Sequence, residues 1–175
     1  MLEDLGVNIV YADILAKQAL QKLPKAKLAA SFGPEVISNN TVNKEKLAQV
    51  VFNNAAKKKE LESLIHPMVR ASSLKAFSEH LKKDSKVIVY ECPLFFESNL
   101  NPKDYKEVIL VKTDHEKAIT RASQRDGKDK DLIAKRYKTQ ISNEDKIPLS
   151  SYVINNNRNL KNLEKEVRKL FEYLK

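Results

Sequence analysis

Two segments of almost unbroken apolar sequence, KVIVYECPLFF (86–96) and EVILVKT (107–113), place the strongest limit on the fold of this chain. A strand that is apolar on both faces has to be covered on both faces, as in a parallel sheet flanked by helices. Shorter strand patterns occur at 8–11 and 151–157, and segments with the helical period separate the strands. No tight-turn signal joins the strands as hairpins. The sequence therefore predicts one α/β domain, residues 1–175, with a mostly parallel sheet and right-handed crossovers.

The expected helices are recognised by apolar residues three and four positions apart. The segment LEDLGV (2–7) is typical of the last turn of a helix that ends at Gly6. The longest pattern covers 57–81, and the proline within it predicts a boundary or a kink at His66–Pro67. The other expected helices cover 14–23, 28–32, 44–52, 115–126, 129–140 and 159–174, and 33–43 is expected to be a loop.

Composition limits the kind of partner and site. The 32 Lys and Arg residues against 23 Asp and Glu give a net charge of +9, which favours nucleotides, phosphorylated cofactors or nucleic acid as partners. Gly6, Gly33 and Gly127 are too far apart for the G-x-x-x-x-G-K-[ST] or G-x-G-x-x-G pattern. One cysteine and three histidines predict neither a disulfide nor a Cys/His metal site. No apolar run approaches the roughly 18 residues of a membrane span, so we expect a cytoplasmic protein.

An acid, Asp13, follows the first strand and precedes the first helix. Ligands of parallel α/β folds bind at the carboxyl ends of the strands, where this carboxylate is expected to lie. An aspartate between a strand and a helix is also a good N-cap. The position therefore predicts a helix cap, a carboxylate that accepts a proton from a substrate hydroxyl, or both.

The segment 121–138 is rich in basic residues and includes Arg121 and Arg125, which share one helix face because they are four positions apart. It is either a solvated helical hairpin or a basic lid that folds over a polyphosphate, since guanidinium groups suit phosphate oxygens. Glu91 and Glu97 flank the end of the strand that Pro93 stops.

These segments together resemble the dephospho-CoA kinase family. LGVNIVYADILAKQAL (5–20) is similar to the family's segment in which a D-A-D triplet precedes a helix. FGPEVI, LESLIHPMVR, CPLFFE, TRASQRDG and YVINNN follow in the family's order and at its spacing, so that the likeness runs from residue 1 to about 175. The combination is fairly specific, whereas each motif alone is weak.

The resemblance implies a three-layer P-loop-kinase-like fold. It also implies that the γ-phosphoryl group of ATP, with Mg²⁺, is transferred to the ribose 3′-hydroxyl of dephospho-CoA. Asp13 matches the second acid of the triplet, the family's proposed general base, and Arg121 matches the arginine that stabilises the transferring group. Arg125, Lys128 and Arg136 match a helical lid at about 121–140 that contacts ATP.

The resemblance assigns the helices between about 24 and 83 to an acceptor-binding region. His66, Pro93, Leu94 and Glu97 are the expected substrate-binding residues. No protein metal ligand, no membrane contact and no specific nucleic acid are expected, and the oligomeric state stays open.

The sequence departs from the family in three places. In the family a strand and a Walker A loop precede the point where this chain begins, and Tyr11 stands at the first acid of the triplet. Ser150–Ser151 stands where an Ala-Asp pair is common. We therefore expect residues 1–175 alone to be inactive or nearly so. A non-catalytic nucleotide- or nucleic-acid-binding module and another small-molecule kinase of the same fold stay open as alternatives.

Overall fold

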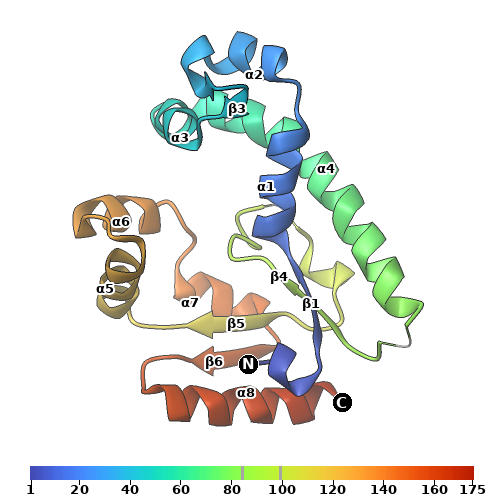
Figure 1. Cartoon of the computed structure of the whole chain (residues 1–175). Helices are drawn as coiled ribbons and strands as arrows, with labels where there is room; N and C mark the ends of the chain where they lie inside the picture. The colour runs from blue at the N-terminus through green and yellow to red at the C-terminus, as the bar shows by residue number, and fades with distance from the viewer. Residues whose placement is uncertain (84, 99) are drawn as a thin grey trace. The chain divides into compact units, whose positions relative to one another are not determined.

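The computed structural model describes residues 1–83, 85–98 and 100–175, and the chain divides into two compact units (Figure 1). Residues Asn8–Cys92 form one of them, which we call the inserted unit. Met1–Val7 and Pro93–Lys175 together form the other, which we call the base unit.

A parallel pair of strands starts and ends the inserted unit. β1 (Asn8–Tyr11) lies beside β4 (Ile88–Glu91), with Tyr11 opposite Glu91 at their carboxyl ends. β4 is shorter than the apolar run that predicted it, because Pro93 lacks the N–H that would continue the ladder and a turn follows. α1 (Ala12–Lys22) leaves β1 directly and packs along α4 (Ala55–Leu81) (Figure 1).

The core of the inserted unit lies where α2 (Lys25–Phe32) and α3 (Lys44–Phe52) meet the first half of α4. At its centre, the side chains of Leu28 and Val36 are fully buried. Apolar side chains of α4 pack around these residues, among them Leu61, Leu64, Ile65 and Met68.

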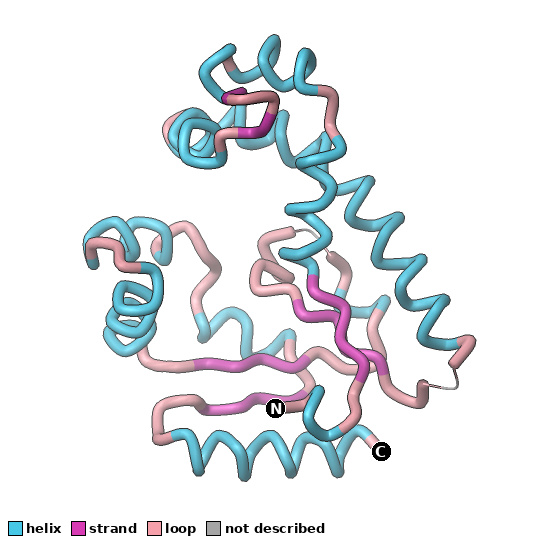
Figure 2. Tube along the Cα trace, in the orientation of Figure 1, coloured by secondary structure: helices cyan, strands magenta, loops and turns pink. Residues whose placement is uncertain are grey.

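A small antiparallel hairpin lies inside the segment that was expected to be a loop. η2 (Pro34–Val36) leads into β2 (Ile37–Ser38), which pairs with β3 (Thr41–Val42) (Figure 2). The loop prediction for 33–43 is wrong here because Asn39 and Asn40 adopt φ of 48° and 57°. Positive φ at both central residues is what a two-residue hairpin turn requires, and asparagine tolerates it better than most residues.

α4 continues through Pro67, so the predicted helix boundary at His66–Pro67 is wrong, and the alternative, a kink, stays a prediction. Proline removes one helical hydrogen bond, which costs about 3 kcal/mol in a helix interior. Packing on both sides of Pro67 outweighs that cost. The first half of the helix lies in the core described above, and in the second half the Phe77 ring meets the Tyr90 ring edge-on at 5.6 Å.

The base unit is built on a second parallel pair, β5 (Ile109–Lys112) and β6 (Tyr152–Asn155). α8 (Leu160–Leu174) packs against β6, and Ile154, Val167 and Leu170 form the buried centre. Leu2 and Leu5, from the single 3₁₀ turn η1 (Glu3–Leu5), join this cluster. Gly6 ends the turn with φ of 85°, as predicted from the sequence.

Two helices project from the carboxyl end of β5 and then return toward β6. α5 (His115–Asp126) and α6 (Lys130–Tyr137) pack against each other and are joined at Gly127, whose φ is 62°. Two shorter elements that were not predicted follow, α7 (Asn143–Lys146) and η4 (Ile147–Leu149). One further 3₁₀ turn, η3 (Pro102–Asp104), precedes β5.

The described strands thus form two parallel pairs and one short antiparallel pair, and each parallel pair is connected through helices. This arrangement confirms the predicted α/β class with mostly parallel pairing. The single-domain boundary 1–175 stays a prediction.

Candidate active site

Asp13 lies in the first turn of α1, one residue after the helix begins at Ala12. The N-cap position belongs to Tyr11, which makes no side-chain cap hydrogen bond, so the prediction that Asp13 caps the helix is wrong. Its side chain is exposed at the carboxyl end of β1. The location agrees with the alternative expectation, a carboxylate available to a ligand at the end of a strand.

Glu91 is the second acid at this edge of the inserted unit. It is the last residue of β4 and lies opposite Tyr11 in the parallel register. Burial raises the pKa of Glu91 above its usual range, and the negative charge of Asp13 raises it further. The Asp13 carboxylate therefore lies close enough to influence the ionisation of Glu91. The sequence placed Glu91 at a strand end but gave it no role, because only the β1–β4 register brings it to Asp13.

Arg121 belongs to the base unit, on the second turn of α5. Its Nη1 donates a hydrogen bond to the backbone carbonyl oxygen of Asn156, immediately after β6, at 2.7 Å. The guanidinium group is thus held at the carboxyl end of the β5–β6 pair. The predicted cooperation of Arg121 with Asp13 involves two different units and stays a prediction.

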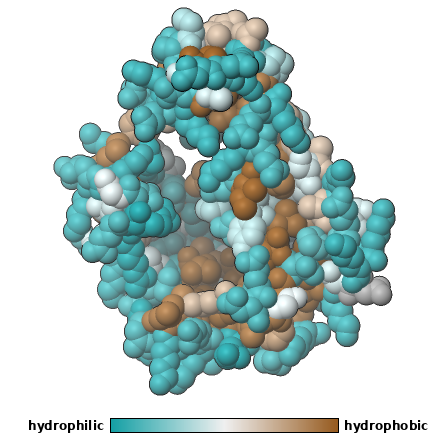
Figure 3. Space-filling model, in the orientation of Figure 1, coloured by the Kyte–Doolittle hydropathy of each residue, from teal (hydrophilic) through white to brown (hydrophobic). Residues whose placement is uncertain are grey.

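The other basic residues of the predicted lid lie on the exposed surface of α5, α6 and the turn between them, which is mostly hydrophilic (Figure 3). Arg125 is paired with its neighbour Asp126, with Nε 2.7 Å and Nη2 3.1 Å from the two carboxylate oxygens. Hydrogen bonding by Arg125 lowers the pKa of Asp126. Lys128 and Arg136 are exposed. Because these basic side chains are exposed, they can contact phosphate groups without leaving a packed core.

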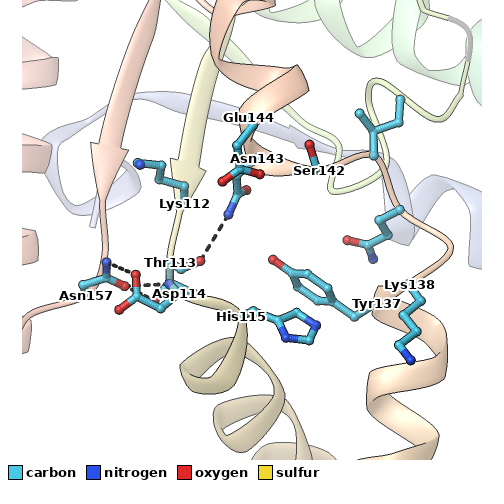
Figure 4. A pocket seen from close by; sticks show the side chains of 12 residues that line it. Lys112, Thr113, Asp114, His115, Tyr137, Lys138, Ser142, Asn143, Glu144 and Asn157 are labelled. Carbon is cyan, nitrogen blue, oxygen red and sulfur yellow. Dashed lines mark hydrogen bonds between the residues drawn. The ribbon is translucent and has the colours of Figure 1, made fainter.

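A cavity of about 520 Å³ opens beside the carboxyl ends of β5 and β6 (Figure 4). Its walls come from the start of α5, the end of α6, α7 and the residue that follows β6 by two positions. His115 and Tyr137 both line it, and their rings pack edge to face with centres 4.7 Å apart. The cavity lies where parallel α/β folds bind their ligands.

Glu97 lies in the turn after β4 and is largely buried. Its Oε1 accepts hydrogen bonds from Lys146 Nζ and from the Ile141 N–H, both at 2.9 Å. Burial alone would raise the pKa of Glu97, but these hydrogen bonds and the lysine charge hold it below its usual range. No local pattern signals this ion pair, because Lys146 is 49 positions away in the sequence, on a helix that was not predicted.

The remaining expected substrate-binding residues are accessible. His66 is exposed on α4 of the inserted unit. Pro93 and Leu94 are exposed in the turn after β4, and 46% of the Leu94 surface is accessible. A ligand can reach these three side chains, so their binding role stays a prediction.

The described residues contain no cluster of three or more His, Cys, Asp or Glu side chains that could hold a metal ion. Within the same part of the chain, no helix is both long and apolar enough to cross a membrane.

Comparison with known proteins decides the family. The sequence model of one family, described as dephospho-CoA kinase, matches residues 1–162. The chain belongs to the dephospho-CoA kinase family. A dephospho-CoA kinase from Fusobacterium nucleatum is 34% identical over 173 residues, which cover 98% of this chain and 88% of the relative. One from Gamma-proteobacterium EBAC31A08 is 36% identical over 170 residues, covering 95% and 84%.

Solved structures agree with the family assignment. The crystal structure of TT1252 from Thermus thermophilus is similar to this chain with a TM-score of 0.84 and 25% identity, over 99% of this chain and 88% of that one. Dephospho-CoA kinase from Campylobacter jejuni has a TM-score of 0.72 and 27% identity, over 98% and 87%. These similarities confirm the predicted P-loop-kinase-like fold of dephospho-CoA kinases.

Proposed function

We propose that this member of the dephospho-CoA kinase family transfers the γ-phosphoryl group of ATP to the ribose 3′-hydroxyl of dephospho-CoA. Family membership supports the reaction class. The observation that carries the proposal to individual residues is the pair of carboxylates, Asp13 and Glu91, at the carboxyl ends of two paired parallel strands.

Asp13 is the proposed general base. Glu91 is the more buried of the two carboxyl groups, and burial together with the negative charge of Asp13 raises its pKa. Asp13 is the more accessible of the two to a substrate hydroxyl. An exposed carboxylate can accept the proton of the 3′-hydroxyl as the hydroxyl oxygen attacks the γ-phosphorus and the bond between that phosphorus and the β-phosphate oxygen breaks.

Arg121 is the proposed stabiliser of the transferring phosphoryl group. Phosphoryl transfer depends on fixed cations near the oxygens that carry charge, and a guanidinium group held by a backbone carbonyl is such a cation. Arg125, Lys128 and Arg136 are proposed to contact ATP from the lid. Closure of the lid over the nucleotide would exclude water, which otherwise competes with the acceptor hydroxyl.

Mg²⁺ fits the donor set at the Asp13–Glu91 edge. This ion takes oxygen ligands and is usually held by one or two carboxylates together with substrate phosphates and water. Glu91 would hold it together with the substrate phosphates and water, which leaves Asp13 to accept the proton, and the ion would neutralise charge on the phosphates.

The acceptor is proposed to bind to the helices between about 24 and 83 of the inserted unit, with His66 as one contact. Pro93 and Leu94 are proposed to contact the same substrate. Both are exposed in the turn that follows β4, so a ligand can reach them.

The test is 3′-phosphorylation of dephospho-CoA with ATP and Mg²⁺. Residues 1–175 contain no Walker A sequence, so we expect little turnover from them alone and clear turnover when a strand and Walker A loop of this family are supplied upstream. Absence of turnover in both forms would refute the proposal. Salt-sensitive binding to oligonucleotides, without any response to dephospho-CoA, would instead favour a binding module.

A substitution tests the role of the base. Asp13→Asn keeps the size of the side chain but removes its basicity, and it should slow turnover by roughly 10²-fold or more while ATP affinity stays within about twofold. Asp104→Asn, the same change in the first turn of η3 outside the proposed binding regions, serves as the control and should leave turnover unchanged.

A further inference from the structure

One side chain at the end of β6 holds the start of α5 through several hydrogen bonds. The Asn157 Oδ1 accepts from Thr113 Oγ1 and from the Asp114 N–H, both at 2.7 Å (Figure 4). Its amide nitrogen donates to Asp114 Oδ1 at 2.5 Å. Both ends of the amide group are thus used on two consecutive residues, which fixes the direction in which the chain leaves β5.

The backbone of the same segment holds the next two turns of α5. The carbonyl oxygen of Asn157 accepts from Lys117 Nζ at 3.1 Å, and that of Asn156 accepts from Arg121 Nη1 at 2.7 Å. Positions 114, 117 and 121 are spaced by three and four, so they share one face of the helix. This face of α5 therefore lies along residues 156–157, and Arg121 is the last contact of the row.

Asp114 shows that this arrangement competes with an ordinary helix cap. It occupies the N-cap position of α5, yet its side chain makes no cap hydrogen bond. An aspartate at this position normally accepts from a backbone N–H of the first turn, which is worth about 1 kcal/mol. Here the carboxylate accepts from Asn157 instead and lies 3.6 Å from Lys117 Nζ.

We propose that Asn157 is a positioning residue for Arg121: its amide fixes Thr113 and Asp114, and thereby the path of α5 that delivers the guanidinium group to the carboxyl end of β6. The inference rests on the proposed function, because it assigns Arg121 a part in the phosphoryl transfer. The side chain has to be an amide. A carboxylate at position 157 would keep the acceptor for Thr113 but would face the Asp114 carboxylate at hydrogen-bond distance.

A double substitution that swaps the side chains of positions 114 and 157 provides the matched test. Asn157→Asp places two carboxylates together, whereas Asn157→Asp combined with Asp114→Asn restores one amide facing one carboxylate. Hydrogen exchange of the amides from 114 to 121, measured on residues 1–175, should quicken by about tenfold or more in the single variant and return to the wild-type rate in the double variant. Unchanged exchange in the single variant would overturn the inference.

Kinetics of the form that turns over test the link to Arg121. Asn157→Asp should lower kcat by roughly 10- to 100-fold, while the KM for ATP stays within about twofold. The double variant, Asn157→Asp with Asp114→Asn, should recover kcat. In an Arg121→Ala background, Asn157→Asp should change kcat by less than about twofold, because the residue acts through Arg121. The positioning role would be refuted if Asn157→Asp lowered kcat by its full factor in the Arg121→Ala background, or if the double variant did not recover kcat.

The two levels of the inference can fail separately. If the wild-type protein never turns over, the proposed function fails and the kinetic role of Asn157 fails with it, while hydrogen exchange still reports whether Asn157 holds α5. If the wild-type protein turns over and Asn157→Asp leaves kcat unchanged, the positioning role fails and the proposed function stands.

Discussion

Lys146→Met removes the cation of the buried ion pair in the base unit, and the expected result is a large loss of stability. Lys146 is 7% exposed, and its Nζ lies 2.9 Å from Glu97 Oε1. Without it, Glu97 keeps only the Ile141 N–H as a partner on Oε1, while Oε2 is buried and already has no hydrogen bond. A buried charge left without its counterion costs about 3–5 kcal/mol.

The measurement is urea unfolding at pH 7, followed by circular dichroism, for the wild type, Lys146→Met, and Lys146→Met combined with Glu97→Gln. The double variant buries no charge, so it should be more stable than Lys146→Met by about 1 kcal/mol or more. Lys135→Met on the exposed surface of α6 is the control and should change the free energy of unfolding by less than about 0.5 kcal/mol.

The pH dependence gives a second readout with a definite sign. The pKa of Glu97 is lowered in the folded protein, so the ion pair stabilises above the unfolded pKa of about 4.3 and this contribution is lost as the pH falls through the folded pKa. In Lys146→Met the buried carboxylate has no cation and its pKa should rise, so acidification should stabilise that variant relative to neutral pH. A loss below about 1 kcal/mol for Lys146→Met, or a double variant no better than the single, would refute the reasoning.

Three further predictions concern the inserted unit. Asp13→Asn should lower the pKa of Glu91, since it removes a negative charge that raises that pKa. Carbon-13 NMR titration of the Glu91 carboxyl group measures the change, and an unchanged titration would contradict the interaction of Asp13 with Glu91. Asn40→Val should destabilise the hairpin turn by about 1–2 kcal/mol, whereas Asn40→Gly should not, as measured by urea unfolding; equal effects would argue against the positive φ. Pro67→Ala should restore a helical N–H in α4 and raise the free energy of unfolding by about 1–3 kcal/mol; a loss of stability would show that the helix is adapted to the proline.

Local signals in the sequence predicted the strands and the longer helices of the base unit well. A polar first turn, an amphipathic pattern and the glycine at 127 gave the bounds of α5, and the apolar run after Glu107 gave β5. Gly6 predicted the end of the first turn because its positive φ favours a residue without a side chain. Each of these elements is set by residues within a few positions of one another.

The sequence failed where distant residues decide the structure. Pro67 predicts a helix boundary locally, but packing around it keeps α4 continuous. The Glu97–Lys146 ion pair and the contacts of Asn157 with the start of α5 join residues more than 40 positions apart, and no periodic pattern reports them. Asp13 was identified as a site residue at a strand end, whereas its partner Glu91 emerges only from the register of β1 and β4.

The division of the chain has a consequence for its synthesis on the ribosome. Residues 8–92 interrupt the base unit, so Leu2 and Leu5 are made first but belong to a cluster completed by Val167 and Leu170. At a synthesis rate of about 5–20 residues per second, Val167 and Leu170 are made roughly 8–30 seconds after these two leucines. The strands that open and close the interrupting segment are both available once Glu91 has emerged. The nascent chain is therefore expected to pair β1 with β4 before Leu2 and Leu5 reach their cluster.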